Sequence, residues 1–154
     1  MVEEGSHAPD FELRSDTGET VRLSSLRGRP VVLYFYPKDH TSGCTTQACG
    51  IRDAWSEFER AGAVVLGVSP DDVASHERFR ADYELPFTLL ADPDHRIAEL
   101  YGVWGEKSRQ GRTYMGINRS TFVIGPDGTV LTVMHDVKPA THADDVLETL
   151  AAKA

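Results

Sequence analysis

Two apolar runs and one helical stripe stand out in the pattern of hydrophobic positions. Val31–Tyr36 is a continuous run of β-branched and aromatic residues and Ala63–Val68 is a second apolar run, which predicts two strands buried on both faces. Between them, apolar side chains recur at three- and four-residue steps, which predicts a helix from Cys44 to about Ala61. Its buried stripe consists of Ala48, Ile51, Trp55 and Phe58. The order strand, helix, strand indicates a parallel βαβ unit.

The rest of the chain continues the alternation and adds a hairpin. Gly125–Gly128 reads Gly-Pro-Asp-Gly between two strand-like runs, which predicts antiparallel strands there. The other expected elements are strands at Thr20–Leu23, Phe87–Leu90, Ser120–Ile124 and Thr129–His135, and helices at Asp71–Tyr83, Asp94–Tyr101 and His142–Ala152. We therefore expect an α/β protein with a thioredoxin-like fold, in one domain over residues 1–154. Its mixed central β-sheet is flanked by helices and carries an N-terminal β-hairpin extension.

Composition narrows the class of protein. The chain of 154 residues has 24 Asp and Glu against 16 Lys and Arg, a net charge of −8, and it shows no basic cluster. This balance argues against nucleic acid or an anionic membrane as a partner. The N-terminus lacks the pattern of a signal peptide, and no apolar stretch approaches the ~20 residues of a membrane helix, so we expect a cytoplasmic protein.

The only two cysteines, Cys44 and Cys49, follow the first predicted strand at the start of the predicted helix. Two cysteines are too few for a disulfide scaffold, and in a cytoplasmic protein a reactive pair is more common than a structural bridge. A thiol at a helix start meets free N–H groups and the positive end of the helix dipole, which favour the thiolate. Open α/β sheets also place their sites at the carboxyl ends of strands.

The spacing of the two thiols sets a constraint on their chemistry. On an intact helix, Cα atoms five residues apart are ~8.6 Å from each other, beyond the ~7 Å limit for a disulfide. A disulfide between Cys44 and Cys49 therefore requires the helix to unwind. The segment contains weak helix formers, since Thr45, Thr46 and Gly50 lie in or next to it, and glycine alone costs ~1 kcal/mol relative to alanine.

Acidity alone would not make such a thiol fast. A lower thiol pKa increases the thiolate fraction but reduces its nucleophilicity, so the net gain is only a few-fold. We therefore expect donors around the sulfur that stabilise charge in the transition state. The candidates are the Thr41 hydroxyl, the backbone N–H groups of Gly43 and Cys44, and a guanidinium from elsewhere in the chain.

At these residues the chain resembles the peroxiredoxins. Their motif Pro-x-x-x-Thr/Ser-x-x-Cys is matched by Pro37, Thr41 and Cys44, and the Cys-x4-Cys spacing resembles the Q-type subgroup, also called bacterioferritin comigratory proteins. The resemblance covers nearly the whole chain and includes motifs at Ala8–Leu13, Gln47–Gly50, Tyr101–Lys107 and Arg119–Phe122. Several motifs in the right order are far more specific than one.

The resemblance implies a thiol peroxidase that reduces hydrogen peroxide and organic hydroperoxides without a metal or organic cofactor. It implies that Cys44 is the peroxidatic cysteine, Cys49 the resolving one, Arg119 the active-site arginine and Thr41 the hydroxyl donor. Pro37 matches the proline that shields the thiol. The resemblance also implies reduction by thioredoxin or a similar dithiol, and a monomer. Serine at position 42 replaces a proline found in many relatives and makes the loop less rigid.

Other functions remain open at this point. A thioredoxin-like protein disulfide oxidoreductase would have Cys-x-x-Cys, and a non-enzymatic redox sensor would need Cys44 without rapid turnover. From the residues alone, Arg119 could be a surface arginine, Thr41 a helix cap and Pro37 a strand terminator. His40 and the two cysteines do not match zinc-site spacings and lack a fourth ligand. The other histidines have polar neighbours in the sequence and are expected to be solvated: His7, His76, His95, His135 and His142.

Overall fold

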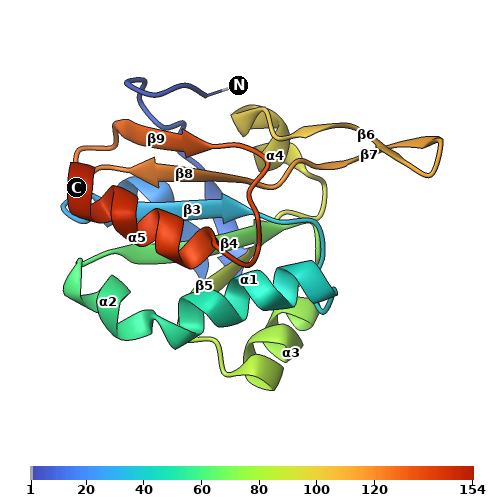
Figure 1. Ribbon diagram of the computed structural model, residues 1–154, viewed down its shortest axis with the longest axis horizontal. Coiled ribbons are helices and arrows are strands. Elements are labelled where there is room, and N and C mark those ends of the chain that lie inside the picture. The colour runs from blue at the N-terminus through green and yellow to red at the C-terminus, as the bar shows by residue number, and fades with distance from the viewer. Residues whose placement is uncertain (1) are drawn as a thin grey trace.

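A computed structural model describes residues 2–154 of the chain (Figure 1). The strands in this range are β1 (Glu12–Ser15), β2 (Thr20–Arg22), β3 (Val31–Phe35), β4 (Val64–Ser69), β5 (Thr88–Ala91), β6 (Trp104–Arg109), β7 (Arg112–Ile117), β8 (Ser120–Ile124) and β9 (Val130–Met134). The helices are α1 (Ser42–Asp53), α2 (Trp55–Arg60), α3 (Val73–Tyr83), α4 (Arg96–Tyr101) and α5 (His142–Lys153), with a 3-10 turn η1 (Leu23–Leu26). Within residues 2–154, no helix combines the length and the apolar character needed to cross a membrane.

Seven strands form one mixed sheet in the order β2-β1-β5-β4-β3-β8-β9. β3 pairs in parallel with β4, and β4 pairs in parallel with β5, as the βαβ pattern predicts. β8 and β9 extend the sheet as antiparallel strands, and β1 with β2 forms the expected N-terminal hairpin, antiparallel to β5. The mixed thioredoxin-like sheet and the N-terminal hairpin are therefore confirmed.

The position of β3 at the centre of the sheet explains why its sequence is apolar throughout. Val31, Leu33 and Phe35 belong to the core on one face of the sheet, which also contains residues of α4. Val32 and Tyr34 alternate with them into the core on the other face, beneath α1, α2, α3 and α5. Both faces are thus covered by helices, and a strand in this position has no solvent side on which to place a polar residue.

One expectation about the elements is wrong, and one hairpin is missing from the prediction. The predicted helix over residues 44–61 is interrupted at Ala54 (φ −102°, ψ 16°), which separates α1 from α2. Position 54 is an alanine flanked by Asp53 and Trp55, so no proline or glycine marks the break in the helix. The hairpin β6–β7 is not predicted, because most of its residues are polar. Neither of its strands pairs with the main sheet. Its two-residue turn, Gln110-Gly111, has positive φ at both positions (53° and 77°), which is a hairpin signal that the sequence does contain.

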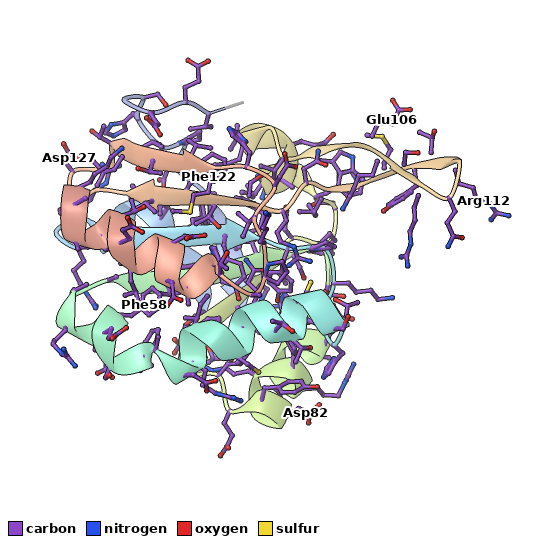
Figure 2. All side chains as sticks on the ribbon, in the orientation of Figure 1. Phe58, Asp82, Glu106, Arg112, Phe122 and Asp127 are labelled. Carbon is purple, nitrogen blue, oxygen red and sulfur yellow. The ribbon has the colours of Figure 1, made fainter. Side chains whose placement is uncertain are left out.

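The carboxyl ends of the parallel strands and the start of α1 lie at the same edge of the sheet (Figure 1). The β6–β7 hairpin projects beyond this edge, with Glu106 and Arg112 far out along it, whereas Asp127 in the β8–β9 turn lies at the opposite end (Figure 2). The cysteine pair is therefore at the end of the molecule that carries the hairpin.

Candidate active site

The loop between β3 and α1 is fixed by a buried carboxylate, Asp39. Its Oδ1 accepts a hydrogen bond from the Tyr36 hydroxyl at 2.6 Å, and its Oδ2 lies 2.7 Å from Nδ1 of His76 and 2.8 Å from the Ser75 hydroxyl. The Asp39 backbone N–H donates to Asp71 at 2.8 Å. Burial opposes ionisation of Asp39, but these hydrogen bonds outweigh it and hold the pKa of this carboxyl below its ordinary value. The loop therefore enters α1 in one defined conformation.

Cys44 occupies the first turn of α1, and its side chain is buried with 2% exposure. Thr41 is the N-cap residue of this helix, so Gly43 and Cys44 carry backbone N–H groups for which the helix offers no acceptor. These dipoles and the helix end favour negative charge near the sulfur. The placement at a helix start, expected from the pattern, is confirmed.

Arg119 lies in the connection between β7 and β8, and its guanidinium meets the cysteine directly. Its Nη2 donates toward Cys44 Sγ at 3.4 Å, and its Nη1 donates to Gln47 Oε1 at 2.5 Å. Gly43 leaves room for this approach, since a Cβ at that position would lie 3.3 Å from Arg119 Nη2 and would require a shift of a few tenths of an ångström. The fork of the guanidinium thus spans the thiol and the amide at once, which a lysine could not do.

A buried chain of polar side chains continues from Gln47. The Gln47 Nε2 lies 3.0 Å from His142 Nδ1, and His142 Nε2 lies 2.7 Å from the Thr121 hydroxyl. Both His142 and His76 are buried, with 1% and 0% exposure, so the expectation that they are solvated is wrong. Their neighbours in the sequence are polar, but the fold places both rings in the interior, which sequence neighbours alone do not indicate.

Burial lowers the pKa of His142 to about 4, with Asp145 opposing the shift and Arg119 adding to it. In the unfolded chain this ring takes up a proton near its ordinary pKa of 6.5, whereas the folded chain keeps it neutral down to about 4. Acid therefore favours the unfolded state across that window. We expect the free energy of unfolding to fall by about 2 kcal/mol from this residue between about pH 7 and pH 5. Urea unfolding of wild type and His142→Asn checks it: equal pH dependence in the two proteins would contradict the assignment.

Cys49 lies on the same unbroken helix as Cys44 and is partly exposed, and both cysteines are free thiols. The spacing argument holds for this conformation, because α1 is continuous from Ser42 to Asp53. The structure therefore presents one buried thiol beside Arg119 and a second thiol, in the next turns of the helix, that needs a backbone rearrangement to reach it.

Thr41 and Pro37 border the cysteine along the chain. The Thr41 hydroxyl donates to the Lys38 carbonyl at 2.8 Å and makes no side-chain capping bond to α1. To donate to another acceptor it would have to rotate and give up this bond. Pro37 is partly buried in the loop after β3. Ser42 is the first residue of α1 and is exposed, a position that proline fits equally well.

His40, Cys44 and Cys49 do not form a group of potential metal ligands in the described part of the chain. His40 Nε2 lies 2.9 Å from Asp82 on α3. Among residues 2–154, the side chains that approach closely enough to share an ion are Asp39, Asp71 and His76. Those three are already linked through hydrogen bonds that fix the loop.

A buried cysteine at a helix start, with an arginine beside its sulfur and a second cysteine in the same helix, is suited to a thiol-dependent redox protein. The sequence comparison agrees: residues 5–133 match the AhpC/TSA family. "Peroxiredoxin Bcp" of Bacillus subtilis is 48% identical over 149 residues, covering 97% of this chain and 95% of that protein. The chain belongs to the AhpC/TSA family, with relatives of the Bcp and peroxiredoxin Q type.

Solved structures give the same result. PrxQ from Xylella fastidiosa superposes with a TM-score of 0.93 at 34% identity, covering 99% of this chain and 97% of that one. The bacterioferritin comigratory protein of Xanthomonas campestris superposes with a TM-score of 0.87 at 40% identity, covering 92% and 90% of the two chains. That protein has been described in terms of its alkyl peroxide reduction activity.

Proposed function

We propose that this chain is a thiol peroxidase that reduces hydrogen peroxide and organic hydroperoxides to water and alcohols. The single observation that supports it most strongly is the 3.4 Å contact between Arg119 Nη2 and the sulfur of the buried Cys44. A cation contacts this sulfur, and the first turn of α1 supplies two backbone N–H groups that have no acceptor within the helix. Such donors stabilise negative charge as it moves from a thiolate to the leaving oxygen of a peroxide. No resident metal or organic group takes part in the proposed reaction.

In the first step, the Cys44 thiolate attacks the terminal oxygen of the hydroperoxide. An S–O bond forms, the O–O bond breaks, and the other oxygen leaves as water or an alcohol once it has taken up a proton. The cysteine is oxidised to a sulfenic acid as the peroxide is reduced. Arg119 stabilises the charge during this transfer. We assign to Thr41 the role of hydroxyl donor, after rotation away from Lys38, and to Pro37 the role of limiting access of water to the thiol.

Arg119→Lys tests the role of the guanidinium. We expect the second-order rate constant for peroxide to fall by about a hundredfold, because an ammonium group cannot reach Cys44 and Gln47 together. Stopped-flow oxidation of the reduced protein measures this rate constant. The matched control is Arg112→Lys, at the exposed start of β7, which should react like wild type. Equal rates for Arg119→Lys and wild type would remove Arg119 from the reaction.

In the second step, the first turns of α1 unwind and Cys49 attacks the sulfur of the Cys44 sulfenic acid. A disulfide forms and the oxygen leaves as water. Unwinding breaks the contacts that Arg119 and His142 make with Gln47, which lies between the two cysteines. The folded helix therefore serves the first step, and its opening serves the second.

Gly50→Ala tests the unwinding. The new Cβ would lie 3.8 Å from the Ala143 Cβ, an ordinary van der Waals distance, so the folded helix accepts it. The folded α1 should gain about 1 kcal/mol, and formation of the Cys44–Cys49 disulfide should slow about fivefold. Stopped-flow measurement of closure after one equivalent of peroxide gives the rate.

The control for this change is Ser56→Ala in α2, an exposed position on a helix that does not unwind in the proposed step. Closure in Ser56→Ala should match wild type. An unchanged or faster closure in Gly50→Ala would contradict the proposed opening of α1.

In the third step, we propose that thioredoxin or a similar dithiol reduces the disulfide by exchange. We also propose that the chain works in the cytoplasm as a monomer. Steady-state consumption of hydrogen peroxide with thioredoxin as the reductant tests the function as a whole. A protein disulfide oxidoreductase would instead reduce protein disulfides without consuming peroxide, and a sensor would react once without turnover. No measurable consumption by the reduced wild type would reject the proposal.

A further inference from the structure

Gln47, His142 and Thr121 form a hydrogen-bonded chain that ends on the Arg119 guanidinium. The links are 2.5 Å from Arg119 Nη1 to Gln47 Oε1, 3.0 Å from Gln47 to His142, and 2.7 Å from His142 to Thr121. The side chains come from α1, α5 and β8, and all three residues are at most 1% exposed. Buried polar groups are costly unless each has a partner, and here each one has a partner.

The hydrogens in this chain can be arranged in one way only. A guanidinium can only donate, so the Gln47 oxygen faces Arg119 and its amide nitrogen faces His142. An amide nitrogen also only donates, so His142 Nδ1 accepts. The ring proton is then on Nε2, from which it is donated to the Thr121 hydroxyl oxygen. Each link fixes the orientation of the next.

We propose that His142 is a positioning residue for the peroxide reaction: it holds the Gln47 amide, which in turn holds the Arg119 guanidinium on Cys44. The inference rests on the proposed function. Without the acceptor on His142, the Gln47 amide would keep a buried N–H without a partner and would be free to rotate away from Arg119. A small displacement of a charge-stabilising group is enough to cost a large part of a rate enhancement.

The protonation of His142 is consistent with this role. Burial is the main cause that lowers its pKa to about 4. Asp145 on the same helix opposes the shift, and Arg119 reinforces it. The ring is therefore neutral at the pH of a cytoplasm, and Nδ1 is available as an acceptor. A protonated ring would turn an N–H toward the amide hydrogens of Gln47.

Two substitutions separate positioning from packing. His142→Asn retains an acceptor near the place of Nδ1, whereas His142→Leu fills a similar volume without a polar atom. We expect His142→Leu to lower the second-order rate constant for hydrogen peroxide by about tenfold or more, and His142→Asn to stay within about threefold of wild type. Loss of the same size in both variants, or no loss in His142→Leu, would overturn the inference.

A double-mutant cycle tests whether His142 acts through Gln47. In a Gln47→Met background, His142→Leu should change the peroxide rate by less than about twofold, because the link is already absent. Independent, multiplying losses from the two substitutions would overturn the inference. Failure of the wild type itself to react with peroxide would be seen in the same experiment and would instead reject the proposed function.

The ring proton offers a measurement that needs neither variant nor peroxide. In the ¹⁵N spectrum of the wild type at neutral pH, the His142 ring should carry its proton on Nε2 and leave Nδ1 unprotonated. A proton on Nδ1 would overturn the inference. This measurement can overturn the inference even if His142→Leu does not fold.

Discussion

Cys44→Ser should lower the rate of peroxide consumption by roughly a thousandfold or more. A serine hydroxyl is un-ionised at neutral pH and has no sulfur to accept the peroxide oxygen, so neither the nucleophile nor the sulfenic acid can exist. The buried site should accept the smaller oxygen, and the fold should survive. Peroxide consumption with a dithiol reductant, measured beside thermal unfolding of the same sample, checks both expectations.

The rate of peroxide consumption by Cys44→Ser is compared with that of Cys49→Ser in the same assay. If Cys44→Ser retained a tenth or more of the wild-type rate while remaining folded, the attacking thiol would have been wrongly assigned. Loss of activity together with loss of the folded state would call for Cys44→Ala, which keeps a small apolar side chain in the buried site.

Cys49→Ser should leave the first reaction with peroxide close to the wild-type rate but block recycling. Cys49 is partly exposed, and the contacts of the Cys44 sulfur with Arg119 do not include it, so the first step is unaffected. The sulfenic acid then has no partner thiol within the chain, and steady-state turnover with the dithiol should fall to a few per cent of wild type or less. A stopped-flow trace of the first turnover and a steady-state assay measure the two parts.

Either part of this result can contradict the assignment. A slow first turnover would place Cys49 in the attack step. Full steady-state turnover would show that an external thiol, rather than Cys49, resolves the sulfenic acid.

The sheet could be predicted because its central strands are constrained on both faces. β3 and β4 have no solvent side, so their sequences are continuous apolar runs, and the turn at Gly125–Gly128 is explicit. The strands of the β6–β7 hairpin are not constrained in this way, since both of its faces are largely polar and it lies outside the main sheet. Its one local signal is the Gln110-Gly111 turn. The break between α1 and α2 at Ala54 is likewise not marked by a proline or glycine.

Some residues of the site could also be predicted from local sequence, whereas others could not. Cys44, Thr41 and Cys49 are close in sequence, so a helix start and ideal helix geometry are enough to place them. Arg119 comes to Cys44 across the fold from another strand connection, and its place follows from the family resemblance rather than from any local pattern. Gln47 gave one usable sign: it lies three residues after Cys44, on the same face of the helix as that buried thiol. His142 gave none, because its burial depends on how α5 packs against α1 and β8.

The central claim is that one thiol attacks in the folded site and the other resolves after α1 opens. The most direct measurement is mass spectrometry of the reduced protein after one equivalent of hydrogen peroxide, with unreacted thiols alkylated. We predict a single chain that has lost two hydrogens and takes up no alkylating reagent, with a Cys44–Cys49 cross-link in the digest. A product with oxygen retained on Cys44 and an alkylated Cys49, or a covalent dimer, would contradict the claim.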